Sequence, residues 1–252
     1  MISRLNLFQI INDDFYSFSQ MSSDPHKPFR FKQFEVSQGR SAMRVGTDAV
    51  LFAAWVGVET AKYILDVGTG SGVIALILAQ RNQHALIDAI EIDSGSSEDS
   101  EINFKASPWH DRLRLYEGDF LKIIAKDKFD LIVSNPPYFS QSLRASDPIR
   151  NTARHDDSLP AEAFMIRAKS LLTAEGRVAL IFPTTQLERW IEASAAVGLV
   201  PARVCHVFTL AHKAKNLNFI KIYTRALSIY VNFDIRFKAL LSKLYPASAL
   251  PH

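Results

Sequence analysis

Cysteine is almost absent from this sequence, in which Cys205 is the only one among 252 residues. A single thiol excludes an internal disulfide and a cysteine-based zinc site. The seven histidines are scattered without the spacing of metal ligands, so we expect no metal. Such sparing use of cysteine suits a reducing compartment, and we expect the protein to be cytoplasmic.

Long apolar runs are also missing, since no run reaches the roughly 20 residues needed to cross a bilayer. We therefore expect no membrane partner. Glycine and proline are not enriched, with 10 and 11 residues, and a hydrophobic content of 48% is ample for a core. The net charge of +3 permits a nucleic-acid partner without requiring one.

The length fits one large domain or one domain with small appendages. Residues 29–36 alternate apolar and polar side chains like a strand, and Ala49–Trp55 has a helical pattern. Met21 resembles an alternative start. We expect a flexible or extra N-terminal segment at 1–28, a strand and helix lid segment at 29–60, and the main domain at 61–252.

In the main domain, strand-like apolar runs alternate with helical patterns, which predicts an α/β fold with a mainly parallel, doubly wound sheet. The expected strands are Tyr63–Val67, Leu86–Ile92, Arg112–Tyr116, Phe129–Ser134 and Arg177–Phe182, with the last strands drawn from Val204–Thr209, Phe219–Tyr223 and Leu227–Phe233. The expected helices are Val73–Gln80, Ser94–Ala106, Ala161–Leu172 and Thr185–Val197, with a short closing helix at Arg236–Leu244.

A glycine-rich loop follows the first of these strands, in Asp66-Val-Gly-Thr-Gly-Ser-Gly72. It is one residue shorter than the dinucleotide-binding pattern Gly-x-Gly-x-x-Gly, whose loop cradles a pyrophosphate. S-adenosylmethionine has no phosphate, and glycines allow the backbone to approach its amino-acid tail closely. We expect the cofactor to contact Asp66, which can accept from its ammonium, together with Gly68, Thr69, Gly70 and Gly72.

Acidic residues after the next two strands agree with this interpretation. Glu91 ends the second strand, where the ribose hydroxyls would lie, and Asp93 is its near competitor. Asp119 follows the third strand and could accept from the adenine amine, while Phe120 could flank the ring. The plainer alternative is an ordinary glycine turn with acids that cap helices, and three matches in order make it the weaker one.

The residues that carry chemistry come after the fourth strand, in Asn135-Pro136-Pro137-Tyr138. The Asn135 amide and the Pro136 carbonyl can accept hydrogen bonds from an exocyclic amine on a planar ring. The prolines restrict the backbone, and Tyr138 can stack on the ring. In isolation Asn-Pro-Pro would be read as a turn, but after such a loop it predicts methyl transfer to nitrogen.

These motifs together resemble the bacterial tRNA1(Val) adenine-N6 methyltransferases. The matching pieces are Phe31-Lys-Gln-Phe34, Met43-Arg-Val-Gly-Thr-Asp48, Leu65–Gly72, Ser107-Pro-Trp-His-Asp-Arg112, Ser134–Tyr138 and Arg150-Asn-Thr-Ala-Arg-His155. The resemblance, over about residues 29–245, implies a Rossmann-like sheet of seven strands, S-adenosylmethionine as cofactor, tRNA as substrate and a monomer. Residues 94–100 and 211–225 depart from the family, and we expect the first departure to touch no catalytic group.

Two further groups of residues have open roles. Thr47 and Asp48 could form a lid over the cofactor, as the resemblance implies, or could cap the helix that follows. Six basic residues could hold RNA phosphates or could be ordinary solvated charges; they are Lys32, Arg40, Arg44, Arg144, Arg150 and Arg154.

The Asn-Pro-Pro-Tyr motif alone does not choose the acceptor. It also serves methylation of guanine amines in ribosomal RNA, of adenine in DNA and of a glutamine amide in release factors, all of which present a planar nitrogen. A non-catalytic RNA-binding module on the same fold is an alternative of another class. The intact Asp66, Glu91, Asp119 and Asn135 argue against that module.

Overall fold

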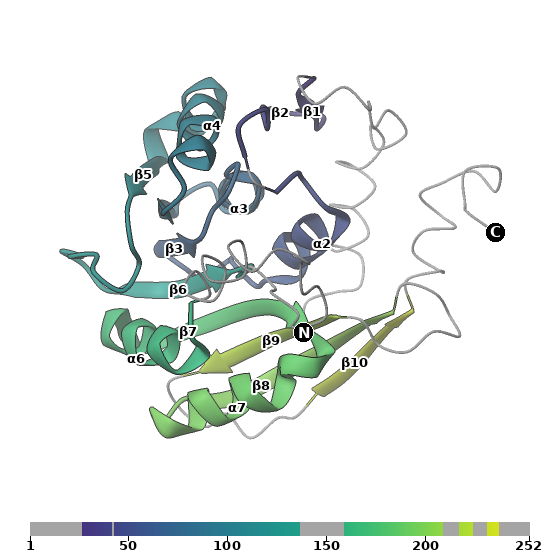
Figure 1. Ribbon diagram of the computed structural model, residues 1–252, viewed down its shortest axis with the longest axis vertical. Coiled ribbons are helices and arrows are strands. Elements are labelled where there is room, and N and C mark those ends of the chain that lie inside the picture. The colour runs from purple at the N-terminus through teal and green to yellow at the C-terminus, as the bar shows by residue number, and fades with distance from the viewer. Residues whose placement is uncertain (1–26, 42, 137–158, 209–216, 224–230, 237–252) are drawn as a thin grey trace, which may run out of the picture.

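The computed structural model describes residues 27–41, 43–136, 159–208, 217–223 and 231–236 (Figure 1). One large sheet organises this part of the chain. Its strands are β3 (Tyr63–Val67), β4 (Leu86–Glu91), β5 (Leu113–Glu117), β6 (Phe129–Ser134), β7 (Leu172–Pro183), β8 (Val200–Phe208), β9 (Leu217–Tyr223) and β10 (Val231–Arg236). They lie in the order β10-β8-β9-β7-β6-β3-β4-β5.

Most neighbouring strands in this sheet are parallel. The five strands β7, β6, β3, β4 and β5 pair in parallel, while β9 is antiparallel to both β7 and β8. The predicted α/β class and mainly parallel sheet are therefore confirmed. The expected number of seven strands is corrected to eight in the described residues, because β10 pairs in parallel with the outer edge of β8.

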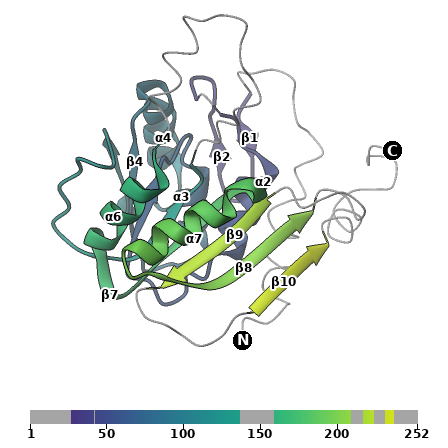
Figure 2. The same ribbon diagram turned by 60° about the horizontal axis from the view of Figure 1, so that its bottom comes forward.

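Five α-helices of the described residues cover the two faces of the sheet, as Figures 1 and 2 show. They are α2 (Thr47–Trp55), α3 (Val73–Arg81), α4 (Ser94–Ala106), α6 (Ala161–Leu171) and α7 (Leu187–Ala196), with 3-10 turns η2 (His110–Arg112) and η3 (Thr184–Gln186). In Figure 1, α2, α3 and α4 lie above the sheet, and α6 and α7 lie below it. The predicted double winding follows from this arrangement.

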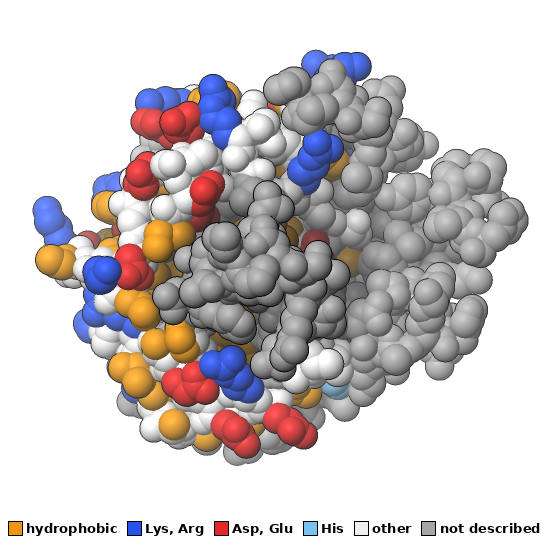
Figure 3. Space-filling view, viewed as in Figure 1, with side chains coloured by type: hydrophobic (Ala, Val, Ile, Leu, Met, Phe, Trp, Pro, Cys, Tyr) orange, Lys and Arg blue, Asp and Glu red, His pale blue; other side chains and the backbone are white. Residues whose placement is uncertain are grey.

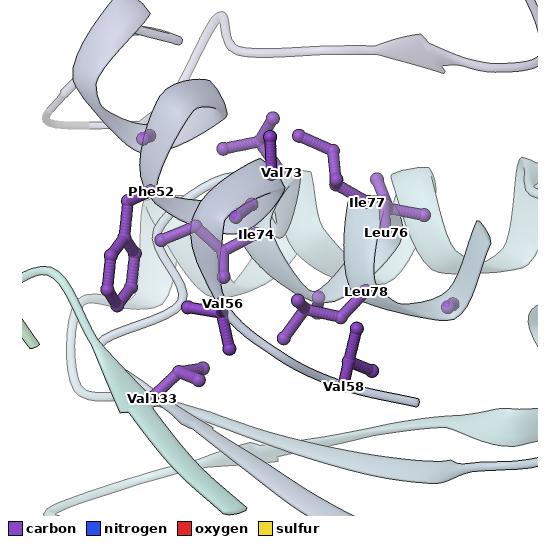
Figure 4. Close-up of a cluster of buried hydrophobic side chains, with 14 of the residues drawn as sticks. Phe52, Val56, Val58, Val73, Ile74, Leu76, Ile77, Leu78 and Val133 are labelled. Carbon is purple, nitrogen blue, oxygen red and sulfur yellow. The ribbon is translucent and has the colours of Figure 1, made fainter. Parts of the chain in front are cut away.

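The alternation of side chains along each strand builds two separate cores. In β3, Ile64 joins the core beneath α2 and α3, whereas its neighbour Leu65 joins the core beneath α6 and α7. Figure 4 shows the first core, where Val56 lies between Ile74 of α3 and Val133 of β6. Apolar residues at consecutive strand positions are thus required, because helices bury both faces of the sheet.

A small antiparallel hairpin, β1 (Phe29–Arg30) and β2 (Glu35–Val36), packs beside α4. Phe31 stacks on Phe34 with ring centroids 4.3 Å apart, and Phe34 meets the Trp109 ring edge-on at 5.5 Å. These contacts bring together two of the pieces that carry the family resemblance, residues 31–34 and 107–112. The hairpin shares the first core with the main sheet, and the division of the chain at residue 61 stays a prediction.

Candidate active site

The glycine loop and Asn135 meet at one edge of the sheet. Strands β3 and β6 are neighbours, with Val67 opposite Ser134 at their carboxyl ends. The Ser134 hydroxyl donates to the Val67 carbonyl at 2.8 Å, and both residues are buried. Gly68 and Asn135 are the next residues of the two strands, so the loop and the Asn-Pro-Pro segment begin side by side, where open α/β sheets bind ligands.

The glycine loop adopts a backbone that other residues rarely take. Gly68, Gly70 and Gly72 have φ angles of +68°, +60° and +82°. A Cβ at Gly72 would lie 2.5 Å from the Phe104 ring, so this glycine allows the loop to pack on α4. Among the residues that the structure describes, a Cβ at Gly68 or Gly70 would meet no atom within 4 Å. The described residues therefore leave this backbone open to the close approach of a ligand.

Asp66 lies beneath this loop and is fully buried. Its Oδ2 accepts hydrogen bonds from the Thr69 hydroxyl at 2.7 Å and from the Ala75 N–H at 3.2 Å. Asp66 and Thr69, both predicted cofactor contacts, therefore also hold the loop to α3. The buried Oδ1 of Asp66 has no hydrogen-bond partner within the described parts of the chain.

Burial raises the pKa of Asp66 to about 7, because the charged carboxylate is removed from water. The hydrogen bonds from Thr69 and Ala75 oppose this rise, and the nearby Glu91 carboxylate adds to it. A cation beside the unpartnered Oδ1 would favour the charged form. The carboxyl group thus fits the ammonium group of an amino-acid tail.

Glu91 joins the end of β4 to the glycine loop. Its Oε2 accepts from the Gly70 N–H at 2.8 Å, and its Oε1 accepts from the N–H groups of Ile92 and Asp93 at 2.9 Å. A carboxylate oxygen can accept two hydrogen bonds, so Oε2 keeps capacity for a ligand hydroxyl. Asp93 has a different position, because its side chain caps α4 by accepting from the Ser96 N–H at 2.8 Å.

The end of β5 is hydrogen-bonded to the end of β4, beside Glu91. Gly118 donates its N–H to the Glu91 carbonyl at 2.7 Å, which brings Asp119 to the loop after β5. The Asp119 Oδ1 accepts from the Leu121 N–H at 2.9 Å, and its side chain is 28% exposed. Phe120 lies in the second core with its ring centroid 5.0 Å from that of Phe164. Its contact with an adenine ring stays a prediction.

Part of the predicted catalytic motif can be placed. Asn135 is half-buried and Pro136 is buried directly after β6. Pro137 and Tyr138 lie outside the described residues, as do the three predicted RNA contacts Arg144, Arg150 and Arg154.

The start of α2 corrects one expectation. The helix begins at Thr47, and its N-cap is Gly46, so neither Thr47 nor Asp48 caps it. Asp48 lies in the first turn, where its Oδ1 accepts from the Ala49 N–H at 3.0 Å and a negative charge favours the helix dipole. The role of these two residues as a lid stays a prediction.

The basic residues of the N-terminal segment differ in their surroundings. Lys32 and Arg44 are exposed. The Arg40 guanidinium is paired with α4, with its Nε 3.0 Å from Glu98 and one of its terminal nitrogens 3.6 Å from Asp99. Basic and acidic side chains are intermixed over the described part of the face in Figure 3. RNA contact by these three residues stays a prediction.

The sequence did not lead us to predict the buried polar face of α4, which includes Asp99, Ser100 and Asn103. That residues 94–100 touch no catalytic group stays a prediction, but they do reach the predicted cofactor loop, because the Ser100 hydroxyl donates to the Gly70 carbonyl. Asn103, one turn later, donates to the Ser71 carbonyl at 2.8 Å. Spacing of Ser96, Ser100 and Asn103 on one helix face is the signal that could have revealed a buried polar surface.

The described residues lack two further kinds of feature. They contain no helix with the length and apolar character of a membrane span. They also contain no group of three or more His, Cys, Asp or Glu side chains placed to hold a metal ion.

Comparisons with known proteins point to one enzyme class. Residues 41–189 match the Methyltransferase small domain family. The tRNA1(Val) (adenine(37)-N6)-methyltransferase of Porphyromonas gingivalis is 45% identical, over 75% of this chain and 78% of the relative. The protein of the same name from Vibrio vulnificus is 40% identical, over 72% and 76% of the two chains.

Solved structures agree on the fold. A predicted O-methyltransferase from Agrobacterium tumefaciens superposes with a TM-score of 0.58 at 18% identity, over 75% of this chain and 86% of the other. TrmN from Thermus thermophilus gives a TM-score of 0.54 at 21% identity, over 73% of this chain and 51% of the other. At this level of identity the likeness carries the fold alone.

Proposed function

Because the chain belongs to the tRNA1(Val) (adenine(37)-N6)-methyltransferase family and carries its methyltransferase small domain, we propose that it methylates tRNA. The acceptor is the N6 amine of an adenine in the anticodon region of valine tRNA, and the donor is S-adenosylmethionine. The observation that carries the proposal is the meeting of the glycine loop and Asn135 at the ends of β3 and β6. The names of the relatives supply the choice of acceptor.

The residues around the loop fit S-adenosylmethionine, which supplies a methyl group on a positively charged sulfur. The buried Oδ1 of Asp66, which has no hydrogen-bond partner among the described residues, suits the ammonium of its amino-acid tail. The described residues leave room for that tail beside the backbone of Gly68 and Gly70. The Glu91 carboxylate suits the ribose hydroxyls, and Asp119 suits the adenine amine, because both are hydrogen-bond acceptors at neighbouring strand ends.

Asn135 and Pro136 would hold the amine that accepts the methyl group. An adenine amine is a weak nucleophile because its lone pair is delocalised into the ring. Hydrogen bonds from the amine to the Asn135 amide oxygen and the Pro136 carbonyl would draw its nitrogen towards tetrahedral geometry and free the lone pair. The new carbon–nitrogen bond would form as the bond between the methyl carbon and the sulfonium sulfur breaks, so that the sulfur leaves as a neutral thioether and the nitrogen loses one proton to solvent. Most of the rate would then come from positioning. A base in an RNA loop is already accessible to such a site.

The test is transfer of labelled methyl groups to bulk unmodified tRNA, followed by nucleoside digestion and mass analysis. We expect label in N6-methyladenosine. Label in ribosomal RNA, DNA or a release factor, with none in tRNA, would show that tRNA is not the acceptor. The proposed transfer of a methyl group to nitrogen would still stand. Binding of S-adenosylmethionine without transfer to any of these would favour an untested acceptor or a binding role.

A further inference from the structure

The polar face of α4 supports the glycine loop from its outer side. The Ser100 hydroxyl donates to the Gly70 carbonyl, and the Asn103 Nδ2 donates to the Ser71 carbonyl at 2.8 Å. Ser100 and Asn103 are themselves buried. Two successive carbonyls of the loop are therefore held by side chains of one helix.

The same face also holds the segment that follows β2, residues 37–41. Asn103 pairs with the backbone of Ser37, accepting from its N–H at 2.7 Å and donating to its carbonyl at 2.8 Å. Asp99 Oδ2 accepts from the N–H groups of Arg40 and Ser41 at 2.8 Å and from the Ser41 hydroxyl at 2.9 Å. The 37–41 segment is thus held to α4 by four hydrogen bonds through its backbone and one through a hydroxyl.

Asn103 is the side chain that touches both parts. Its amide oxygen and its nitrogen are used in three hydrogen bonds, and the residue is 2% exposed. Because a buried polar group without a partner is costly, Asn103 keeps its place only while Ser37 and Ser71 keep theirs. A movement of the glycine loop would therefore displace Asn103 and disturb its hydrogen bonds to the 37–41 segment.

We propose that Asn103 is a positioning residue that couples the 37–41 segment to the cofactor loop. The inference rests on the proposed function, since it takes the loop to bind S-adenosylmethionine. Coupling between two sites is reciprocal. Binding of S-adenosylmethionine at the loop then stabilises the 37–41 segment, and loss of Asn103 weakens both the segment and the binding.

The first arm of the test is calorimetric titration of S-adenosylmethionine onto the full chain and two variants. We expect Asn103→Ala to weaken binding by about fivefold or more, as loss of a hydrogen bond to the loop implies. Asn82→Ala is the matched control. Asn82 is also buried, and its side chain joins Val58 and Ala61 to residues 84–85, away from the loop. The Asn82→Ala substitution should lower the melting temperature and leave the affinity for S-adenosylmethionine unchanged.

The second arm needs no variant to fold, because it follows hydrogen exchange of the wild-type chain in peptides covering residues 35–45. Added S-adenosylmethionine should slow exchange of the amides of Ser37, Arg40 and Ser41. Exchange that is unchanged on binding would overturn the coupling, as would a folded Asn103→Ala variant that binds like the wild type. A wild-type chain that does not bind S-adenosylmethionine would instead overturn the proposed function.

Discussion

The Ser134 hydroxyl donates a hydrogen bond of 2.8 Å to the carbonyl of Val67, and this contact joins the last residues of two neighbouring strands. Both residues are almost fully buried. The glycine loop begins one residue beyond Val67, and Asn135 follows Ser134 directly. Together with the pairing of β3 and β6, this hydroxyl holds Asn135, which we propose binds the acceptor amine, in place relative to the glycine loop.

We therefore expect Ser134→Ala to reduce kcat by more than the accompanying loss of folding stability explains. The lost hydrogen bond should lower the free energy of unfolding by about 1 kcal/mol, and it should loosen Asn135 relative to the loop. Small displacements of a reacting group reduce rates strongly. Steady-state methyl transfer and thermal unfolding measure the two effects.

Ser194→Ala is the matched control for this change. Ser194 is also buried, and its hydroxyl donates to the Ile191 carbonyl at 2.8 Å within α7. The Ser194→Ala variant should lose about as much stability as Ser134→Ala and keep the kcat of the wild type. Equal kcat values for the two variants would show that the Ser134 contact has no part in positioning Asn135.

We expect Glu91 to bind the ligand and Asp93 to act only as the N-cap of α4. Glu91→Ala should weaken binding of S-adenosylmethionine by on the order of tenfold or more, since a charged acceptor contributes about 1.5–3 kcal/mol. Asp93→Ala removes the hydrogen bond to the Ser96 N–H and should cost about 1 kcal/mol of stability with little change in affinity. Calorimetric titration of both variants decides the assignment, and the reverse order of affinities would exchange their roles.

Asp66 should make the stability of the ligand-free protein depend on pH. Burial raises the pKa of its carboxyl from 3.8 to about 7 in the folded state. The folded chain therefore holds this proton more tightly than the unfolded chain, and the resulting stability is fully present below about pH 4 and is lost as pH rises through 7. Asp66→Asn stays neutral, so the stability of the wild type relative to this variant should fall over that range.

Chemical unfolding at several pH values, without cofactor, measures this difference. A difference that does not change between pH 4 and 8 would show that Asp66 does not titrate there. Binding should follow the opposite trend, because the ammonium of S-adenosylmethionine favours the ionised carboxylate. The affinity of the wild type should rise from pH 6 to 8, and that of Asp66→Asn should change less.

Residues at strand ends are predictable from the sequence, because parallel strands bring their carboxyl ends to one edge of a sheet. This rule places Gly68, Glu91 and Asn135 together, and the strand pairing agrees with it. The rule does not reveal that Asp66 also anchors Thr69 and Ala75, since those hydrogen bonds depend on how the loop turns back onto α3.

The contacts of α4 are not predictable from local patterns. Asn103 reaches Ser37 and Ser71, which are distant in the sequence, and only tertiary packing brings them together. The serines of this helix lower its intrinsic propensity, so the segment resembles a neutral departure from the family. At Ser100, burial and the hydrogen bond to the Gly70 carbonyl explain why serine stands where alanine would favour the helix more.

Asn135→Ala gives the most direct test of the proposed chemistry. The amide oxygen would be lost from the end of β6, whereas the glycine loop, Asp66 and Glu91 would keep their hydrogen bonds to one another. Methyl transfer should therefore fall below detection while the affinity for S-adenosylmethionine stays within about twofold of the wild type, because only the positioning of the acceptor amine is removed. Single-turnover transfer and calorimetric titration measure the two quantities. A large loss of affinity would place Asn135 in the cofactor site, and substantial remaining transfer would mean that another group holds the amine.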